Sequence, residues 1–142
     1  MKAKAVLLDV NVLLALGWDQ HEAHESVVKR LSGRSAPVWA TCPISQLGFV
    51  RISSTPGVFS YTLSPAQALV ALSRLCADEQ HRFVGDHPSL LDSNLDALSG
   101  PRQTTDAYLI DLARHHSLAL LTLDQRLVNA FPEAPVECLV AA

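Results

Sequence analysis

Apolar and polar positions along the chain predict short buried strands that alternate with helices. Residues 5–8 form a continuous apolar run, which is typical of a strand buried on both faces of a sheet. Further apolar runs predict strands at 38–40, 119–123 and 136–140, with a weaker one at 81–84. Helical spacing of apolar positions predicts helices at 12–16, 21–31, 43–52, 65–78, 88–98 and 105–116. This alternation predicts an α/β fold with a central parallel sheet of about four to five strands and helices on both faces.

Local signals at the ends of the predicted helices support this division. Ser64 is a good N-cap, Pro65 suits the first helical position, and Gln67 completes a capping box. Either Thr104 or Thr105 is expected to cap the helix that follows it. No linker or internal repeat interrupts the pattern, so residues 1–142 are expected to form a single domain.

Composition narrows the class of protein without identifying its chemistry. The chain has 142 residues, 49% of them hydrophobic, and 11 basic against 14 acidic side chains give a net charge of −3. This excludes global disorder, and the longest apolar runs are far shorter than the ~18–20 residues of a membrane helix. The N-terminal run meets Asp9 too soon for a secretory signal, and the three cysteines form no CxxC pair. We therefore expect a cytoplasmic protein with no membrane association, whose mild acidity argues against binding nucleic acid by bulk charge.

Aspartates stand at the ends of two predicted strands. Asp9 directly follows the first strand, and Asp124 directly follows the strand over 119–123. Ligand sites of open parallel sheets lie at the carboxyl ends of the strands, so both carboxylates are expected at one edge. Asp106 lies in the first turn of the helix over 105–116, where helical spacing directs it toward the packed side. A shared divalent cation would compensate the charge of all three carboxylates at once.

Each aspartate alone also has an ordinary structural interpretation. An aspartate after a strand often forms a turn, and one in a first helical turn often caps the helix or complements its dipole. Three crowded carboxylates are less easily explained, because they repel one another and one would take up a proton unless a metal ion lay between them. Hard oxygen ligands of this kind suit Mg²⁺ or Mn²⁺. The set predicts metal-assisted hydrolysis, with Asp9, Asp106 and Asp124 as metal ligands and catalytic residues.

Five motifs follow one another along nearly the whole chain. They are LDVNVLLAL at 8–16, HEAH at 21–24, PISQLGFVR at 43–51, TDAYL at 105–109 and LTLD at 121–124. In order and spacing they resemble a PIN domain, and more closely the VapC toxins of toxin–antitoxin pairs in the form common in mycobacteria. The resemblance implies a PIN-like three-layer fold and a metal-dependent ribonuclease that cuts RNA and leaves a 5′-phosphate. It also implies a homodimer that is neutralised by a small VapB-like antitoxin.

One position departs from the pattern of this family. The family usually has a glutamate in the helix after the second strand, and this chain has Gln46 there. A glutamine can offer a carbonyl oxygen to a cation, but it brings no charge and cannot act as a carboxylate base. An alternative interpretation is therefore a PIN-fold protein with weak or lost catalysis that acts by binding RNA or an antitoxin. The glutamine is either natural to this branch of the family or a substitution that silences a toxin.

Other polar side chains are candidates for supporting roles at such a site. Asn11 and Thr105 flank the acids and are expected to orient them or a water molecule, although helix capping explains both equally well. Gln46 is a candidate for the same role. Three arginines either line the RNA path or are ordinary surface charges: Arg51, Arg102 and Arg126.

The apolar stretch around the loop after the third helix indicates either a partner interface or ordinary core. Its members are Phe49, Val50, Ile52, Val58, Phe59, Tyr61 and Leu63. An interface here would favour a dimer, in which two acidic sites could face one RNA from both sides.

A phosphatase-like enzyme is the remaining alternative for Asp9. Haloacid dehalogenase relatives use an aspartate after the first strand as nucleophile, and this chain is similar to them only in that residue. Their usual DxD pair is replaced here by Asp9-Val10-Asn11, and no lysine follows in a suitable motif.

Overall fold

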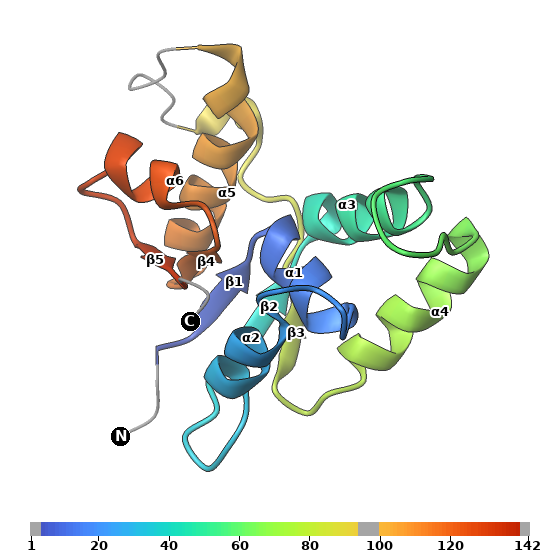
Figure 1. Ribbon diagram of the computed structural model, residues 1–142. Helices are drawn as coiled ribbons and strands as arrows, with labels where there is room; N and C mark the ends of the chain where they lie inside the picture. The colour runs from blue at the N-terminus through green and yellow to red at the C-terminus, as the bar shows by residue number, and fades with distance from the viewer. Residues whose placement is uncertain (1–3, 94–99, 140–142) are drawn as a thin grey trace.

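A five-stranded parallel sheet forms the centre of the described part of the chain, which is residues 4–93 and 100–139 of a computed structural model. In chain order the strands are β1 Val6–Leu8, β2 Trp39–Thr41, β3 His81–Phe83, β4 Ala119–Thr122 and β5 Val136–Cys138. They lie in the order β3-β2-β1-β4-β5, and each neighbouring pair is parallel (Figure 1). The predicted α/β fold class with about four to five parallel strands is confirmed.

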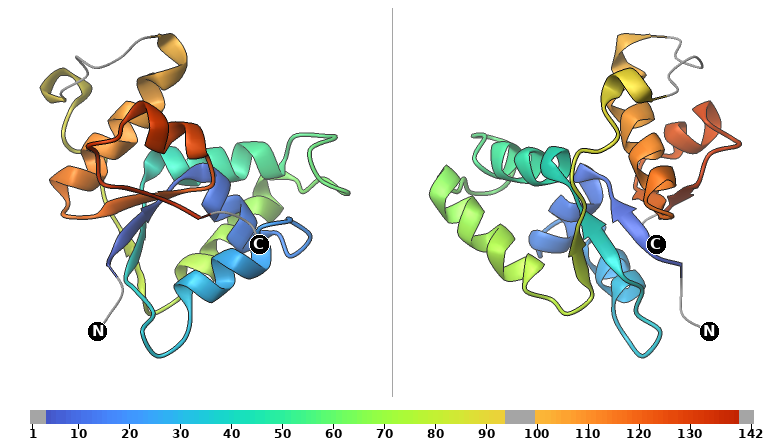
Figure 2. Two further views of the ribbon diagram at one scale, coloured as in Figure 1. Left: turned by 60° about the vertical axis from the view of Figure 1, so that its left-hand side comes forward. Right: turned by 180° about the vertical axis from the view of Figure 1, so that it is seen from behind.

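Helices cover both faces of this sheet (Figure 2). In chain order they are α1 Val10–Gly17, α2 His24–Leu31, α3 Pro43–Ser53, α4 Pro65–Cys76, α5 Thr104–His115 and α6 Gln125–Ala130. Helices α1 to α4 pack on one face, and α5 and α6 pack on the other. Among the described residues, no helix reaches the length and apolarity that crossing a membrane requires.

The alternation of side chains along the central strands explains why both faces need helices. Val6 and Leu8 pack into the core under α1 to α4, whereas Leu7 between them packs against α5. Strand β4 repeats this pattern, with Leu121 in the first core and Leu120 in the second. All five side chains are fully buried. A strand buried on both sides has no polar positions, which is why a continuous apolar run predicts it.

Some helix ends follow their sequence signals and others do not. Ser64 Oγ accepts a hydrogen bond from Gln67 N at 3.1 Å, and Gln67 Oε1 accepts one from Ser64 N at 2.9 Å, so α4 begins as predicted. Helix α5 begins at Thr104 with Gln103 as its N-cap, so neither predicted threonine caps it. Helix α6 has no counterpart among the predicted helices, because six residues are too few for a helical period to be recognised.

The helix predicted over 88–98 does not start where its pattern places it. Only a 3-10 turn, Leu90–Asp92, forms in 88–93, and Ser89 Oγ accepts a hydrogen bond from Leu91 N at 3.2 Å. Residues 94–99 lie outside the described residues. A second 3-10 turn, Pro101–Gln103, then leads directly into α5.

The apolar stretch over 49–63 is mostly core. Phe49 is buried, and four further members of the stretch pack against the core as half-buried side chains: Val50, Ile52, Phe59 and Leu63. Phe59 stacks on Trp18 with ring centroids 4.0 Å apart. Val58 and Tyr61 remain 50% and 54% exposed, so only these two members of the stretch present a substantial apolar surface to a partner.

The carboxyl ends of β1 and β4 lie side by side at one edge of the sheet. Leu8 pairs with Leu121, and Asp9 N continues this ladder by donating a hydrogen bond to Leu121 O at 2.9 Å. Asp9 then caps α1, while Asp124 follows β4 and caps α6. The two strand-end aspartates therefore meet at one edge, in agreement with the strand-end rule.

Candidate active site at the carboxyl ends of β1 and β4

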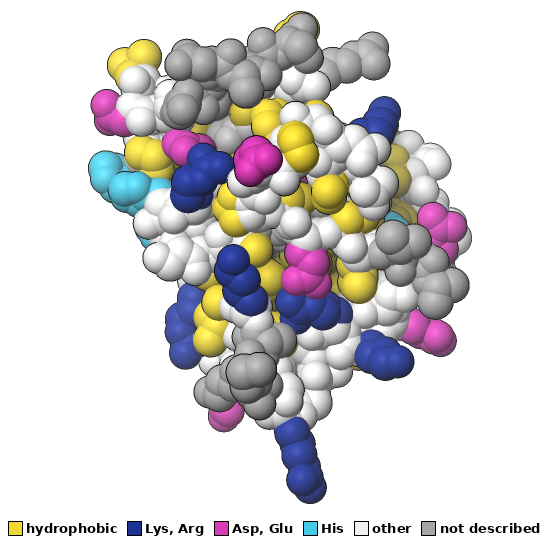
Figure 3. Space-filling model, turned by 90° about the vertical axis from the view of Figure 1, so that its left-hand side faces the viewer, with side chains coloured by type: hydrophobic (Ala, Val, Ile, Leu, Met, Phe, Trp, Pro, Cys, Tyr) yellow, Lys and Arg dark blue, Asp and Glu magenta, His cyan; other side chains and the backbone are white. Residues whose placement is uncertain are grey.

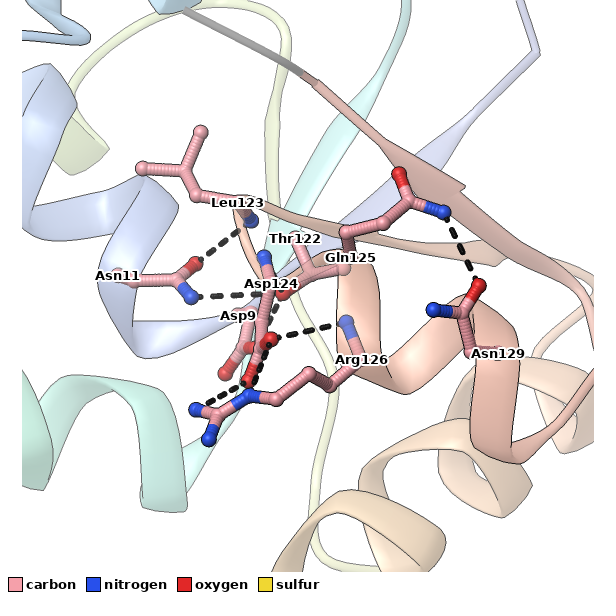
Figure 4. A network of polar contacts seen from close by, with 8 residues as sticks. All are labelled: Asp9, Asn11, Thr122, Leu123, Asp124, Gln125, Arg126 and Asn129. Atoms are coloured by element: carbon pink, nitrogen blue, oxygen red, sulfur yellow. Dashed lines mark hydrogen bonds and ion pairs between the residues drawn. The ribbon is translucent and has the colours of Figure 1, made fainter.

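Asp9 is buried where β1 turns into α1, with both carboxylate oxygens engaged. Its Oδ1 accepts a hydrogen bond from Val10 N at 2.8 Å, and its Oδ2 accepts one from Thr122 Oγ1 at 2.8 Å (Figure 4). Burial raises the pKa of Asp9, the two hydrogen bonds oppose this rise, and the negative charge of Asp124 adds to it. The carboxylate is therefore held in one orientation by its neighbours.

Asp124 lies beside Asp9 and faces a cation from its own helix. Its Oδ1 accepts hydrogen bonds from Arg126 N at 3.0 Å and Arg126 Nε at 3.1 Å, and its Oδ2 accepts one from Arg126 Nη2 at 3.3 Å. The side-chain hydrogen bond from Arg126 lowers the pKa of Asp124. The Arg126 side chain is itself 90% exposed, so this pair lies at the surface of the site.

Asp106 comes to the same place from the first turn of α5 and is half-buried. Burial and, to a smaller extent, the negative charges of Asp9 and Asp124 raise the pKa of Asp106 to about 6, while Arg126 opposes this rise. The three carboxylates are therefore close enough to repel one another. The structure brings together all three aspartates that the sequence singles out.

Thr122 connects the two strand-end aspartates and is a site residue that sequence reasoning missed. Its hydroxyl donates to Asp9, and its oxygen accepts hydrogen bonds from Asp124 N at 3.1 Å and from Asn11 Nδ2 at 3.4 Å. Asn11 Oδ1 in turn accepts a hydrogen bond from Leu123 N at 3.1 Å. The sequence feature that could have identified Thr122 is its hydroxyl within an otherwise apolar strand. A buried polar group needs hydrogen-bond partners, so such a residue is expected to contact other polar side chains.

Gln46 lies on α3, where its amide is tied to the sheet. Gln46 Nε2 donates a hydrogen bond to Thr41 Oγ1 at 3.0 Å, and Thr41 Oγ1 also lies 2.7 Å from His81 Nε2. These contacts join α3 to β2 and β3. The Gln46 amide is the donor in its hydrogen bond with Thr41. A deprotonated glutamate at the same position could only accept a hydrogen bond from the Thr41 hydroxyl.

The remaining predicted site residues are not held at the acidic cluster by any described contact. Thr105 is exposed in the first turn of α5, next to Asp106 in the chain. Arg51 is exposed in the last turn of α3. The side chain of Arg102 lies outside the described part of the chain. Of the two predicted arginines whose side chains are described, Arg51 and Arg126, the second contacts a site carboxylate.

The donor chemistry of the three aspartates fits a divalent cation. Carboxylate oxygens are the ligands that Mg²⁺ and Mn²⁺ prefer, and a cation would relieve the repulsion that raises the pKa of Asp106. Within residues 4–93 and 100–139, no three acidic, histidine or cysteine side chains already stand in an arrangement that could hold an ion. Both oxygens of Asp124 face Arg126, so an ion that used Asp124 would first have to displace the guanidinium.

The face formed by α5, α6 and β5 carries charges of both signs, with apolar side chains between them (Figure 3). In this view most of the lysine and arginine side chains lie in the lower half, with an acidic side chain among them.

Comparison with known proteins shows which family the chain resembles. The PIN domain model matches residues 6–131. Ribonuclease VapC38 of Mycobacterium tuberculosis (strain H37Rv) is 40% identical over 136 residues, which cover 94% of this chain and 96% of the relative. Ribonuclease VapC39 of the same strain is 38% identical over 136 residues, covering 94% and 98% of the two chains. Ribonuclease VapC44 is 40% identical over 132 residues, covering 90% and 92%.

These matches run through both halves of the chain and include every motif on which the resemblance rests. They favour the PIN interpretation over the phosphatase-like alternative for Asp9. The three-layer fold, the aspartates at the strand ends and the sequence similarity along nearly the whole chain all support the same family. The chain belongs to the PIN domain family and, within it, to the VapC ribonucleases.

Proposed function

We propose that this chain is a ribonuclease that hydrolyses the phosphodiester bonds of RNA and serves as the toxin of a type II toxin–antitoxin pair. The observation that carries the proposal is the convergence of Asp9, Asp106 and Asp124, from three separate segments, at one sheet edge of a PIN fold. Relatives named as VapC ribonucleases, which cover 90% or more of this chain, support the same activity.

In this proposal Asp9, Asp106 and Asp124 hold Mg²⁺ or Mn²⁺ and are the catalytic residues. When bound, the ion supplies activation of a water molecule and offsets the charge that develops on the phosphate oxygens. Thr122 fixes the Asp9 carboxylate from one side and the backbone of Asp124 from the other. Asn11 holds the turn between β4 and α6 through Leu123 N. These contacts preorganise two of the three carboxylates before RNA arrives.

Gln46 is compatible with an active enzyme. Its amide donates a hydrogen bond to Thr41, so the glutamine is accommodated by a contact between α3 and β2. We infer that the three aspartates suffice for cleavage without a carboxylate at position 46. The alternative, weak or lost catalysis, predicts instead that activity appears only when a glutamate is restored there.

The test compares four forms of the antitoxin-free protein on total cellular RNA: the unchanged chain, Asp106→Asn, Gln46→Glu and Asp111→Asn. Each form is incubated with Mg²⁺, with Mn²⁺ or with a chelator, and the cut ends are sequenced. Asp111 also lies on α5, but it pairs with Arg114 at 3.5 Å, so Asp111→Asn is a matched change of charge outside the acidic cluster.

The proposal expects chelator-sensitive cleavage by the unchanged chain and by Asp111→Asn. Asp106→Asn should lose more than the roughly 10- to 100-fold that removal of a supporting partner costs at a metal site. Cleavage by Gln46→Glu alone would establish the alternative of a silenced site. Absence of cleavage by every folded form would contradict the ribonuclease proposal.

We also propose that the chain acts in the cytoplasm as a homodimer and is neutralised by a VapB-like antitoxin. The family supports the antitoxin, since its relatives carry the VapC name. Exposed apolar side chains on α4 support an interface, because Leu69 and Val70 are 59% and 51% exposed on one helix.

A further inference from the structure

A pocket with a volume of about 280 Å³ opens beside the acidic cluster, between α5 and α6. Its acidic lining, called the acidic wall below, consists of Asp106 and Asp124, and the exposed Arg126 also lines the pocket. Its apolar lining, called the apolar floor below, includes Leu127 and Phe131. The pocket therefore joins an apolar surface to the same carboxylates that form the proposed site.

The apolar floor is held rigidly by the core beneath it. Leu127 is buried in the core cluster on the α5 face, and Phe131 packs against that cluster as a half-buried side chain. Phe131 N also donates a hydrogen bond to Leu127 O at 2.9 Å, which fixes the end of α6. An aromatic ring held in this way presents a preformed surface, on which a ligand loses little binding energy to reordering.

The charges around the pocket decide what kind of group fits inside. The acidic wall carries two carboxylates, which repel an anionic phosphate except where a bound cation offsets their charge. The guanidinium of Arg126 is the group that suits a phosphate, and its side chain is 90% exposed. A neutral, flat group with polar edges fits inside the pocket, while a phosphate that is joined to it lies outside the pocket.

We propose that this pocket binds the base of a nucleotide adjoining the scissile phosphate of the RNA. The inference rests on the proposed function, because the carboxylates of Asp106 and Asp124 belong to both the pocket and the site. Phe131 lines the pocket with an aromatic ring, the kind of side chain on which unpaired RNA bases stack. The pocket thereby selects the nucleotide at the cut.

Three larger pockets formed by the described residues do not compete for this role. Two of them, with volumes of about 380 and 430 Å³, lie on the α1-to-α4 side, lined by residues such as Trp18 and Tyr61 in the first and Leu31 and Trp39 in the second. The third has a volume of about 360 Å³ and is lined by residues such as His87 and His115. None of these linings includes a carboxylate of the acidic cluster. The 280 Å³ pocket and the proposed site share Asp106 and Asp124. A base in this pocket is therefore within one nucleotide of the reacting phosphate.

A thermodynamic cycle between protein and RNA tests the proposal. The RNA is a short single strand spanning a mapped cut, or one of mixed sequence if no cut is found, and its bases are removed one position at a time. Binding is measured by fluorescence anisotropy with Mn²⁺ in an Asp9→Asn background, where asparagine keeps the helix cap and the RNA stays intact. The same RNAs are bound to Phe131→Ala and to Phe131→Leu in that background. Phe83→Ala is the matched control, because Phe83 on β3 is 56% exposed and lies outside the pocket lining.

The proposal expects one position at which base removal weakens binding by roughly 5- to 100-fold, the loss typical of one stacked base. In Phe131→Ala, removal of the same base should change the affinity less than about twofold, because this variant has no aromatic ring on which the base can stack. Phe131→Leu should lie between these forms, and Phe83→Ala should behave as the unchanged chain. Thermal melts of all forms show whether the variants are folded.

Equal base-removal penalties in the unchanged chain and in folded Phe131→Ala and Phe131→Leu would overturn the pocket assignment. RNA cleavage that continues normally alongside that result would leave the ribonuclease proposal standing. Loss of all RNA binding by the unchanged chain would overturn both. A penalty that falls on a base several nucleotides from the cut would also contradict the assignment, since the pocket and the site share Asp106 and Asp124.

Discussion

At the scale of single residues, the surroundings of Asp106 oppose the negative charge that its proposed role needs. Burial, Asp9 and Asp124 together raise the pKa of Asp106 to about 6, so folding favours its protonated form. Helix spacing in the sequence already indicates that this side chain faces inward. The carboxylates that face it could not be predicted from its own segment, because they come from strands far away in the chain.

Asp106→Asn should stabilise the metal-free protein at pH 7.5 by about 1–2 kcal/mol, allowing for partial solvent screening. A raised pKa in an acid means that the group destabilises the fold above about pH 6 and ceases to do so as the pH falls toward 4. The gain from Asp106→Asn should therefore disappear near pH 4. Urea unfolding in chelator at both pH values measures it. A pH-independent gain, or one shared by Asp111→Asn, would refute this explanation.

Arg126 pairs with Asp124, which lies two positions before it in the chain. Its guanidinium binds both oxygens of Asp124, so it competes with any cation for that ligand. Arg126→Gln should tighten Mn²⁺ binding to the antitoxin-free chain by roughly two- to fivefold, a modest factor because the pair is exposed. Isothermal titration calorimetry measures this, with Arg114→Gln as a control at a similar Arg–Asp pair. Unchanged or weaker Mn²⁺ binding in Arg126→Gln would show that the two cations do not compete.

At the scale of elements, one ion pair joins α2 to the edge strand β5. Arg30 Nε and Nη2 donate to the two oxygens of Glu137 at 2.7 and 2.8 Å. These residues are 107 positions apart, so no local pattern could predict the pair. The hydrogen bond from Arg30 lowers the pKa of Glu137. The central strands, in contrast, were predictable from their own residues because burial on both faces leaves an unbroken apolar run.

Glu137→Gln should lower the free energy of unfolding by about 1 kcal/mol at pH 7, a small value because Glu137 is partly exposed. For an acid with a lowered pKa, the stabilisation is complete above the usual pKa near 4.5 and is lost as the pH falls through the folded value. The difference should therefore narrow below pH 4.5, as measured by urea unfolding across that range. The exposed Glu133→Gln serves as control, and an equal loss in that variant would refute a specific role for the pair.

At the scale of the whole molecule, the apolar surface exceeds what the two cores use. Leu69 and Val70 of α4 are more than half exposed, and Leu47 of α3 is 71% exposed. Sequence reasoning left the stretch over 49–63 open between a partner interface and ordinary core, and most of that stretch packs into the core. The sequence left this open because apolar content alone cannot tell a buried side chain from an exposed one; only the packing of α3 and α4 decides this.

The antitoxin-free chain should sediment with about twice its monomer mass of 15.4 kDa. Burial of the exposed apolar side chains drives this association, so the mass should fall toward the monomer only on strong dilution. Sedimentation equilibrium over a wide range of concentration measures it. A monomeric mass at every concentration would contradict the homodimer.

The sequence by itself determined the alternating strands and helices, the parallel sheet and the two aspartates at strand ends. These features depend on side-chain periodicity and on the strand-end rule, both of which act within short segments. Only the tertiary structure decided that Thr122 links Asp9 to Asp124 and that Phe131 lines a pocket beside them. The physical reason is that each of these contacts depends on how elements pack in space: β1 and β4 pair although more than a hundred residues separate them.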